Sequence, residues 1–114
     1  MKYYQTYNTF QLSGIENINE SLSTHYLVYK IINNINGKHY IGEHKTNNIN
    51  DNYMGSGHMI KLAYKKYQLS SFTKIILFDF DNFEEMNAKE KELVPLSCCY
   101  PMDPMSYNIQ EGGK

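Results

Sequence analysis

The chain has 114 residues, a length that suits one domain with one hydrophobic core. Its composition, 41% hydrophobic and 20% charged, is typical of a folded protein, and no apolar run approaches the length of a membrane-spanning helix. The net charge is −1 and every basic residue other than histidine is a lysine, so the overall charge does not by itself indicate a polyanionic ligand.

The N-terminal residues and the cysteines indicate the cellular compartment. The first residues, MKYYQTYNTFQLSG, lack the apolar segment of a signal peptide. The two cysteines, Cys98 and Cys99, are adjacent in the sequence, and adjacent cysteines rarely form a disulfide with each other. Two cysteines are also too few for a structural zinc site. We therefore expect a cytoplasmic protein without membrane contact, in the host cytoplasm if it is viral, with both thiols reduced.

The chain begins with an N-terminal extension, residues 1–24, whose apolar residues are too irregularly spaced to predict more than one short packed element. The domain proper, residues 25–114, starts with a hairpin: a β-branched and aromatic run at 26–32, a break at NNING, and a second strand at KHYIG. An Asn-Gly turn at 36–37 predicts that Tyr29 faces His44. Side chains alternate along a strand, so one face would carry Tyr29, Tyr40, Gly42 and His44.

The following segments alternate between loop, helix and strand. Residues 46–57, TNNINDNYMGSG, have a loop composition, and Ser56 can cap a helix that runs to about residue 67. FTKIILFDF, at 72–80, predicts a central apolar strand, and a second helix is expected from 82 to about 96. This order predicts a small α/β domain of the α+β layered type, an antiparallel sheet of about three strands flanked by helices.

The ordered motifs resemble those of the GIY-YIG nuclease family. LVY at 27–29 and YIG at 40–42, separated by NGK, are similar to the two halves of the family motif. GSGHMIKLAYKKYQLSSFTKIILFDF, an acidic helix with AKEKELV, and SYNIQEGG then follow in the order of phage-borne, homing-endonuclease-like members. The resemblance extends from about residue 25 to residue 113. It implies a metal-dependent endonuclease that hydrolyses DNA phosphodiester bonds.

The resemblance also implies roles for individual residues. Tyr29 and Tyr40 would activate the attacking water, Glu90 would hold one Mg²⁺ (or Mn²⁺), and Asn108 would support the site. Hydrolysis of a phosphodiester requires a proton acceptor, stabilisation of charge on phosphorus and a cation at the leaving oxygen.

A phenol has a pKa near 10, so it is a poor base at neutral pH unless neighbouring cations assist it. We expect His44 and Lys45 to lie near the phenols and to supply that charge, which would also stabilise the phosphate.

Two positions depart from the family pattern. Leu27 stands where the first motif has a glycine, which is a mild change in a strand. The family places an arginine after YIG at the scissile phosphate, and this chain has none, so a lysine must supply the charge without the bidentate geometry. Lys45 is the first candidate. The residues expected to contact the substrate are Gly42, His58, Lys61 and Lys65.

Each assignment has a competing interpretation. The tyrosines could be aromatic residues that pack across the hairpin, and Glu90 lies in KEKE, which is typical of a solvated helix face. His44 and Asn108 could be turn residues. The alternative metal ligands are Glu92, Asp79 and Asp81.

Three classes of function follow. The leading hypothesis is a DNA endonuclease, with RNA left open as a substrate and with a homodimer or a partner protein compatible with the sequence. The alternative is a catalytically inactive GIY-YIG-fold module that binds nucleic acid or protein. The third is a structural or regulatory α/β protein.

Overall fold

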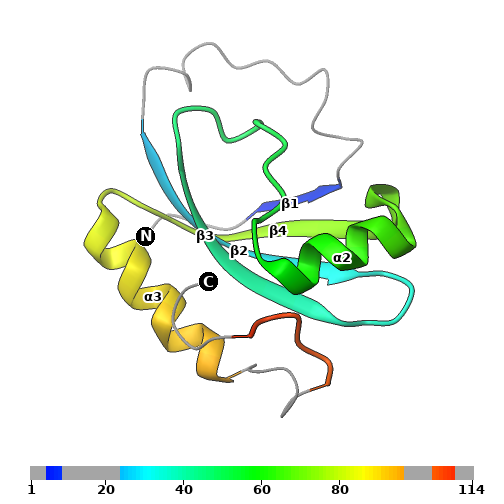
Figure 1. Cartoon of the computed structure of the whole chain (residues 1–114). Coiled ribbons are helices and arrows are strands. Elements are labelled where there is room, and N and C mark those ends of the chain that lie inside the picture. Colours follow the sequence, from blue (N-terminus) through cyan, green and yellow to red (C-terminus); the bar gives the residue numbers. More distant parts are fainter. Residues whose placement is uncertain (1–4, 9–23, 97–103, 110–114) are drawn as a thin grey trace.

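The computed structural model describes residues 5–8, 24–96 and 104–109, so Cys98 and Cys99 lie outside the described residues. Four strands form a single antiparallel sheet in the order β1-β4-β2-β3, in which β4 and β2 are central and β1 and β3 are the edge strands (Figure 1). None of the described helices is long and apolar enough to cross a membrane. The elements are β1 (Gln5–Asn8), β2 (His25–Asn33), β3 (His39–Thr46), α2 (His58–Tyr67), the 3-10 helix η2 (Leu69–Ser71), β4 (Phe72–Phe80) and α3 (Phe83–Leu96).

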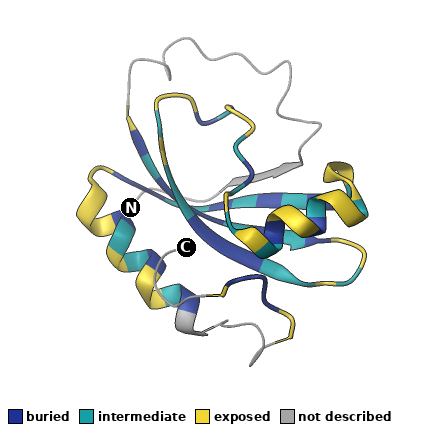
Figure 2. Cartoon of the chain, in the orientation of Figure 1, coloured by how far each residue is buried: buried dark blue, intermediate teal, exposed yellow. Residues whose placement is uncertain are grey.

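The two helices cover opposite faces of the sheet, because alternate side chains of the strands point in opposite directions. On the face covered by α2, Tyr29 and Ile31 pack with Ile60 of the helix. On the face covered by α3, Val28 packs with Val94. Figure 2 shows buried strands between helices whose outer sides are exposed. The predicted α+β class with an antiparallel sheet and flanking helices is confirmed, and β1 adds a strand from the segment 1–24.

The hairpin between β2 and β3 has a longer loop than a two-residue Asn-Gly turn would give. Asn33 N donates to Lys38 O at 2.8 Å, and the Asn33 side chain accepts a hydrogen bond from Ile35 N at 2.9 Å, a local bond that competes with ladder pairing. Tyr29 consequently pairs with Gly42 and not with His44, so the predicted register is wrong by two residues. A shift of two leaves every side chain on its predicted face.

A register shift between β2 and β4 occurs next to Tyr29. Leu27 pairs with Asp79, but Tyr29 pairs with Ile76, so β4 has one extra residue at this point. Such a bulge moves the β4 side chains by one position relative to the two faces. As a result Ile76 and Asp79, three residues apart, both point toward the α2 face.

The helix starts differ in their capping. Gly57 is the N-cap residue of α2 and makes no side-chain cap hydrogen bond, so the expected cap by Ser56 is wrong. Of the two residues that could cap α3, Asp81 and Asn82, it is Asn82 whose Oδ1 accepts a hydrogen bond from Glu85 N, at 2.8 Å.

Candidate functional site

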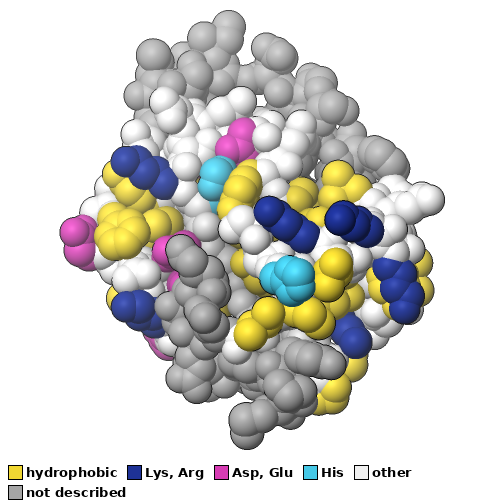
Figure 3. All heavy atoms as spheres, in the orientation of Figure 1, with side chains coloured by type: hydrophobic (Ala, Val, Ile, Leu, Met, Phe, Trp, Pro, Cys, Tyr) yellow, Lys and Arg dark blue, Asp and Glu magenta, His cyan; other side chains and the backbone are white. Residues whose placement is uncertain are grey.

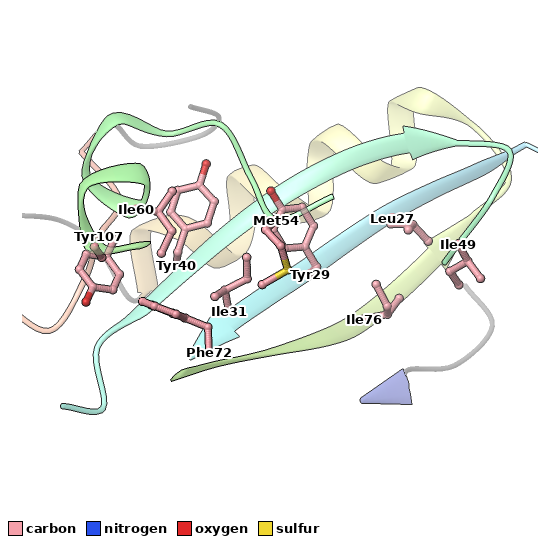
Figure 4. Packing of buried hydrophobic residues seen from close by; sticks show 11 residues of the cluster. Leu27, Tyr29, Ile31, Tyr40, Ile49, Met54, Ile60, Phe72, Ile76 and Tyr107 are labelled. Carbon is pink, nitrogen blue, oxygen red and sulfur yellow. The ribbon is translucent and has the colours of Figure 1, made fainter. Parts of the chain in front are cut away.

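Tyr29 and Tyr40 lie side by side on neighbouring strands, with ring centroids 6.3 Å apart and planes tilted by 40°. Their common face, which the sequence predicts, is confirmed (Figure 4). We would expect the phenols of a catalytic tyrosine pair to project toward a groove that solvent can reach, but both are buried: Tyr29 is 1% exposed and Tyr40 is 5% exposed. The rings are part of the hydrophobic core of this face.

The segment between β3 and α2, residues 47–57 (the β3–α2 loop), covers the tyrosines. Gly55 and Gly57 have no side chain where the rings pass: a Cβ would lie 3.1 Å from Tyr29 Oη at the first and 2.9 Å from Tyr40 Cε1 at the second. Gly42 lies beneath the other side of the pair, where a Cβ would overlap the Tyr29 hydroxyl. Gly42 is buried, and its lack of a side chain leaves room for the phenol of Tyr29.

The surroundings of the phenols disfavour their ionised forms. Burial, followed by the neighbouring phenols and Glu90, raises the pKa of Tyr29 well above its usual value. Burial also raises the pKa of Tyr40 to about 12, with Tyr53 and Glu90 adding to the effect and a hydrogen bond from the Gly57 N–H opposing it. Both hydroxyls are therefore protonated at neutral pH and can donate hydrogen bonds.

Glu90 is buried on α3, with 2% of its surface exposed, and the apolar Met86 and Val94 lie one turn to either side of it. Its negative charge contributes to the raised pKa of both Tyr29 and Tyr40, so it is electrostatically coupled to the pair. The solvated-face interpretation is therefore wrong for Glu90. It is correct for the alternative ligand Glu92, which forms an ion pair with Lys89 at 3.1 Å on the outer side of α3.

The two aspartates considered as alternative ligands differ in environment. Asp79 is 1% exposed and its Oδ2 lies 2.6 Å from His25 Nδ1, so this carboxylate already has a partner. Asp81 is exposed at the end of β4. Within residues 5–8, 24–96 and 104–109, no three His, Cys, Asp or Glu side chains converge as a set of metal ligands.

His44 lies on the same face of the sheet as Tyr40 and contacts two residues of the β3–α2 loop. Its Nε2 is 2.7 Å from Asp51 Oδ2, and its ring stacks on that of Tyr53 at 3.8 Å with an angle of 9°. Asp51 also accepts hydrogen bonds from the Thr46 hydroxyl at 2.8 Å and from Tyr53 N at 3.1 Å. Burial alone would raise the pKa of Asp51, but the hydrogen bonds, chiefly from His44, outweigh it and lower the pKa.

Lys45 does not lie near the phenols. It follows His44 on β3 and so points to the opposite face, where its Nζ lies 5.7 Å from the ring centroid of Tyr26. The prediction that Lys45 supplies positive charge to the tyrosine pair is wrong for this reason.

Lys74 of β4 is the lysine at the tyrosine pair, and the sequence analysis missed it. It is 1% exposed, its Nζ donates to Tyr53 O at 2.6 Å, and the Nζ lies 5.1 Å from the Tyr29 ring centroid. Burial lowers its pKa to about 8, while the Asp51 carboxylate opposes the shift. The signal was a lysine at an inward position of the apolar strand FTKIILFDF.

Asn108 supports the edge strand through the backbone. Its Oδ1 accepts from Ile41 N and its Nδ2 donates to Ile41 O, both at 2.9 Å. Residues next to it extend this contact, since Tyr107 N donates to His39 O at 2.8 Å. The amide is thus bound to the backbone of the YIG segment of β3, which makes Asn108 a positioning residue.

The remaining predicted contacts lie on the outer side of α2. His58, Lys61 and Lys65 are exposed, as is Lys66, whose Nζ lies 5.3 Å from the Tyr67 ring centroid. Figure 3 shows Lys and His side chains gathered on the surface over α2. They form a local basic surface on a protein without net positive charge.

Comparison with known proteins gives relatives of one kind. The chain is 45% identical over 89 residues to putative endonuclease segB, 47% identical over 89 residues to putative endonuclease segD, and 41% identical over 86 residues to endonuclease segA, all of Enterobacteria phage T4. No protein-family model matches the chain, and no solved structure matches it. The alignments cover 75% to 78% of this chain but 38% to 39% of the relatives, so the chain is similar to a part of phage T4 endonucleases that is under half their length.

Proposed function

We propose that this chain is a GIY-YIG-type nuclease domain that hydrolyses DNA phosphodiester bonds. The observation that carries the proposal is the burial of a helical carboxylate, Glu90, in a domain whose paired phenols, Tyr29 and Tyr40, are also buried with ring centroids 6.3 Å apart. Nothing in a purely structural domain requires these groups to share one region, since burial of a carboxylate is costly. The endonuclease names of the phage relatives support the same class of reaction.

The tyrosines act in this proposal as hydrogen-bond donors. Because their hydroxyls are protonated at neutral pH, they orient the attacking water or a phosphate oxygen, and they activate water by position and not by accepting its proton. Tyr40 is the more exposed of the two and is the closer candidate for contact with the reacting phosphate.

Glu90 would hold the metal. Among the described residues no group of three or more His, Cys, Asp or Glu side chains converges, and a single carboxylate such as Glu90 fits Mg²⁺ or Mn²⁺, ions that retain waters and take phosphate oxygens as further ligands. The bound metal would stabilise negative charge on the leaving oxygen. Lys74, fixed beside Tyr29, adds positive charge within the protein.

The outer side of α2 would contact the DNA backbone through His58, Lys61 and Lys65. Lysine contacts with phosphates depend on salt and carry no sequence information, so this surface would give affinity and not specificity.

The test is a plasmid nicking assay with Mg²⁺, with Mn²⁺ and with a chelator, on the wild type and on Glu90→Gln. We expect metal-dependent cleavage by the wild type, and none by Glu90→Gln. DNA binding, measured by fluorescence anisotropy, should persist or tighten in the variant because an anion that repels phosphate is removed. Glu92→Gln on the outer side of α3 is the matched control and should cut like the wild type.

The burial of the phenols favours one competing function, a GIY-YIG-fold module that binds nucleic acid or protein without cutting. Binding of DNA without cleavage under any metal condition would establish that alternative and refute the proposal. Cleavage by Glu90→Gln at the wild-type rate would leave a nuclease but move its metal elsewhere.

A further inference from the structure

Phosphodiester hydrolysis requires a proton acceptor for the attacking water. The phenols are protonated, Lys74 donates its hydrogen bond, and the proposed role of Glu90 is to hold a metal. Water is a weak nucleophile, so a positioned base within the site would contribute about 10²- to 10⁴-fold to the rate. An oriented and accessible base on the α2 face would supply this contribution.

His44 meets the geometric requirements. Its Nε2 faces the ionised Asp51 carboxylate at 2.7 Å, which can only accept a hydrogen bond, so Nε2 carries a proton and Nδ1 of the neutral ring has a free lone pair. Stacking on Tyr53 fixes the ring plane. The side chain retains 18% exposure, more than either phenol, so its ring can meet water.

The partner of His44 is itself held in place from several directions. Asp51 is fixed by the Thr46 hydroxyl and by Tyr53 N. The Tyr53 carbonyl is in turn fixed by the Nζ of Lys74. These contacts fix the orientation of the Asp51 carboxylate and, through it, that of the His44 ring.

We propose that His44 is the general base of the reaction and that Asp51 is its positioning residue, an inference that rests on the proposed nuclease function. As the oxygen of water bonds to phosphorus, its proton passes to His44 Nδ1. The bond from phosphorus to the leaving oxygen breaks, and that oxygen takes a proton from bulk water. His44 then releases its proton to solvent, and Asp51 stabilises the imidazolium in the interval.

The pH dependence of this step depends on the charged groups of the same face. The groups from the β3–α2 loop are Asp51 and Tyr53, and β4 contributes Lys74, whose charge interacts with that of Asp51. The buried pair of His25 and Asp79 lies on the same face of the sheet, beside Leu27, the strand partner of His44. Asp51 is the carboxylate in direct contact with the imidazole.

The test compares single-turnover cleavage by the wild type, His44→Gln and Asp51→Asn across pH 5.5 to 9, with urea unfolding of each protein to establish that it is folded. We expect a loss of about 100-fold or more in His44→Gln, from the usual size of general-base effects. In Asp51→Asn we expect a loss of about 10-fold and an acid limb of the pH–rate profile that moves to lower pH, since the imidazolium loses its carboxylate. His39→Gln, on the opposite face of the same strand, is the control and should match the wild type.

The outcomes separate the two proposals. A wild type that cuts, together with a folded His44→Gln that cuts at the same rate, overturns the base assignment and leaves the nuclease function standing. An unchanged pH profile in Asp51→Asn overturns the positioning role, even if the variant is slower. If His44→Gln unfolds, His44→Gly with added imidazole takes its place, and the absence of rescue overturns the assignment. A wild type inactive with every metal overturns both proposals.

Discussion

Replacement of Gly42 by alanine tests whether the YIG glycine serves to admit the phenol of Tyr29. An added Cβ would overlap the Tyr29 hydroxyl and lie 2.5 Å from Tyr29 Cζ and 3.0 Å from Tyr40 Cε2. Carbon atoms in good contact are about 3.5–4.0 Å apart, so a ring must move by about 1 Å. Both rings are buried, and the glycines of the β3–α2 loop close the other side, so little free space is available.

Overpacking of a core costs about 1–3 kcal/mol, and we expect Gly42→Ala to lie near the upper end, at about 3 kcal/mol. With an m-value of about 2 kcal/mol/M for a protein of this size, the urea midpoint should fall by about 1.5 M. Total stabilities of about 5–15 kcal/mol leave the variant folded.

A double-mutant cycle with Tyr29→Leu supplies the control. Leucine removes both the Cζ and the hydroxyl that the new methyl group would meet, so Gly42→Ala should cost little in the Tyr29→Leu background. The expected coupling is therefore close to the full cost of the single change, about 2–3 kcal/mol, well above the error of about 0.5 kcal/mol for independent sites. Additive effects, or a Gly42→Ala protein as stable as the wild type, would show that the close approach of Tyr29 to the glycine does not determine the residue at this position.

Three further changes test other parts of the molecule. Asn108→Ala leaves a buried N–H and a buried C=O of β3 without their partners, so urea unfolding should show a loss of about 2–4 kcal/mol, and a loss under 1 kcal/mol would contradict the bridging role. For Lys74, the folded pKa of about 8 lies below the unfolded value of 10.5, so the unfolded chain binds more protons between these values and stability rises with pH. We expect the free energy of unfolding to rise by about 2 kcal/mol from pH 8 to 10 in the wild type and not in Lys74→Met. Above pH 10 the buried tyrosines, whose pKa is raised, lower the stability of both proteins. Parallel curves of stability against pH for the two proteins would refute this assignment. Joint replacement of Lys61 and Lys65 by alanine should weaken DNA binding and reduce the slope of log K against log salt by about 2, whereas Lys45→Ala should leave cleavage unchanged.

The amino-acid sequence alone determines which side chains of the hairpin share a face. Strand alternation has a period of two, so Tyr29, Tyr40 and His44 share a face in any register that differs by an even number of residues. The same rule places Lys45 on the opposite face, and its assignment to the phenols failed because nearness in the sequence was taken for nearness in space. Helix extents and the cap at Asn82 were also predictable, since both depend on residues within one or two turns.

The sequence also indicated the burial of two charged residues, Glu90 and Lys74, although their polar character argued against it. Glu90 lies four residues from both Met86 and Val94, a spacing that places it on the buried side of α3 although its neighbours in KEKE are polar. Lys74 occupies an inward position of an apolar strand. Because charged side chains are usually exposed to solvent, the residue type predicted an exposed position for both Glu90 and Lys74, which the fold buries.

Only the tertiary structure decides what covers the tyrosines and what reaches them. The β3–α2 loop closes over the rings because Ile49 and Met54 enter the core on that face, and this brings Asp51 to His44. Asn108 reaches the backbone of Ile41, 67 residues earlier in the chain. These contacts form between segments whose separation in the sequence gives them no common local pattern, so packing across the fold, and not the preference of any residue, determines whether the phenols are exposed and which side chains surround them.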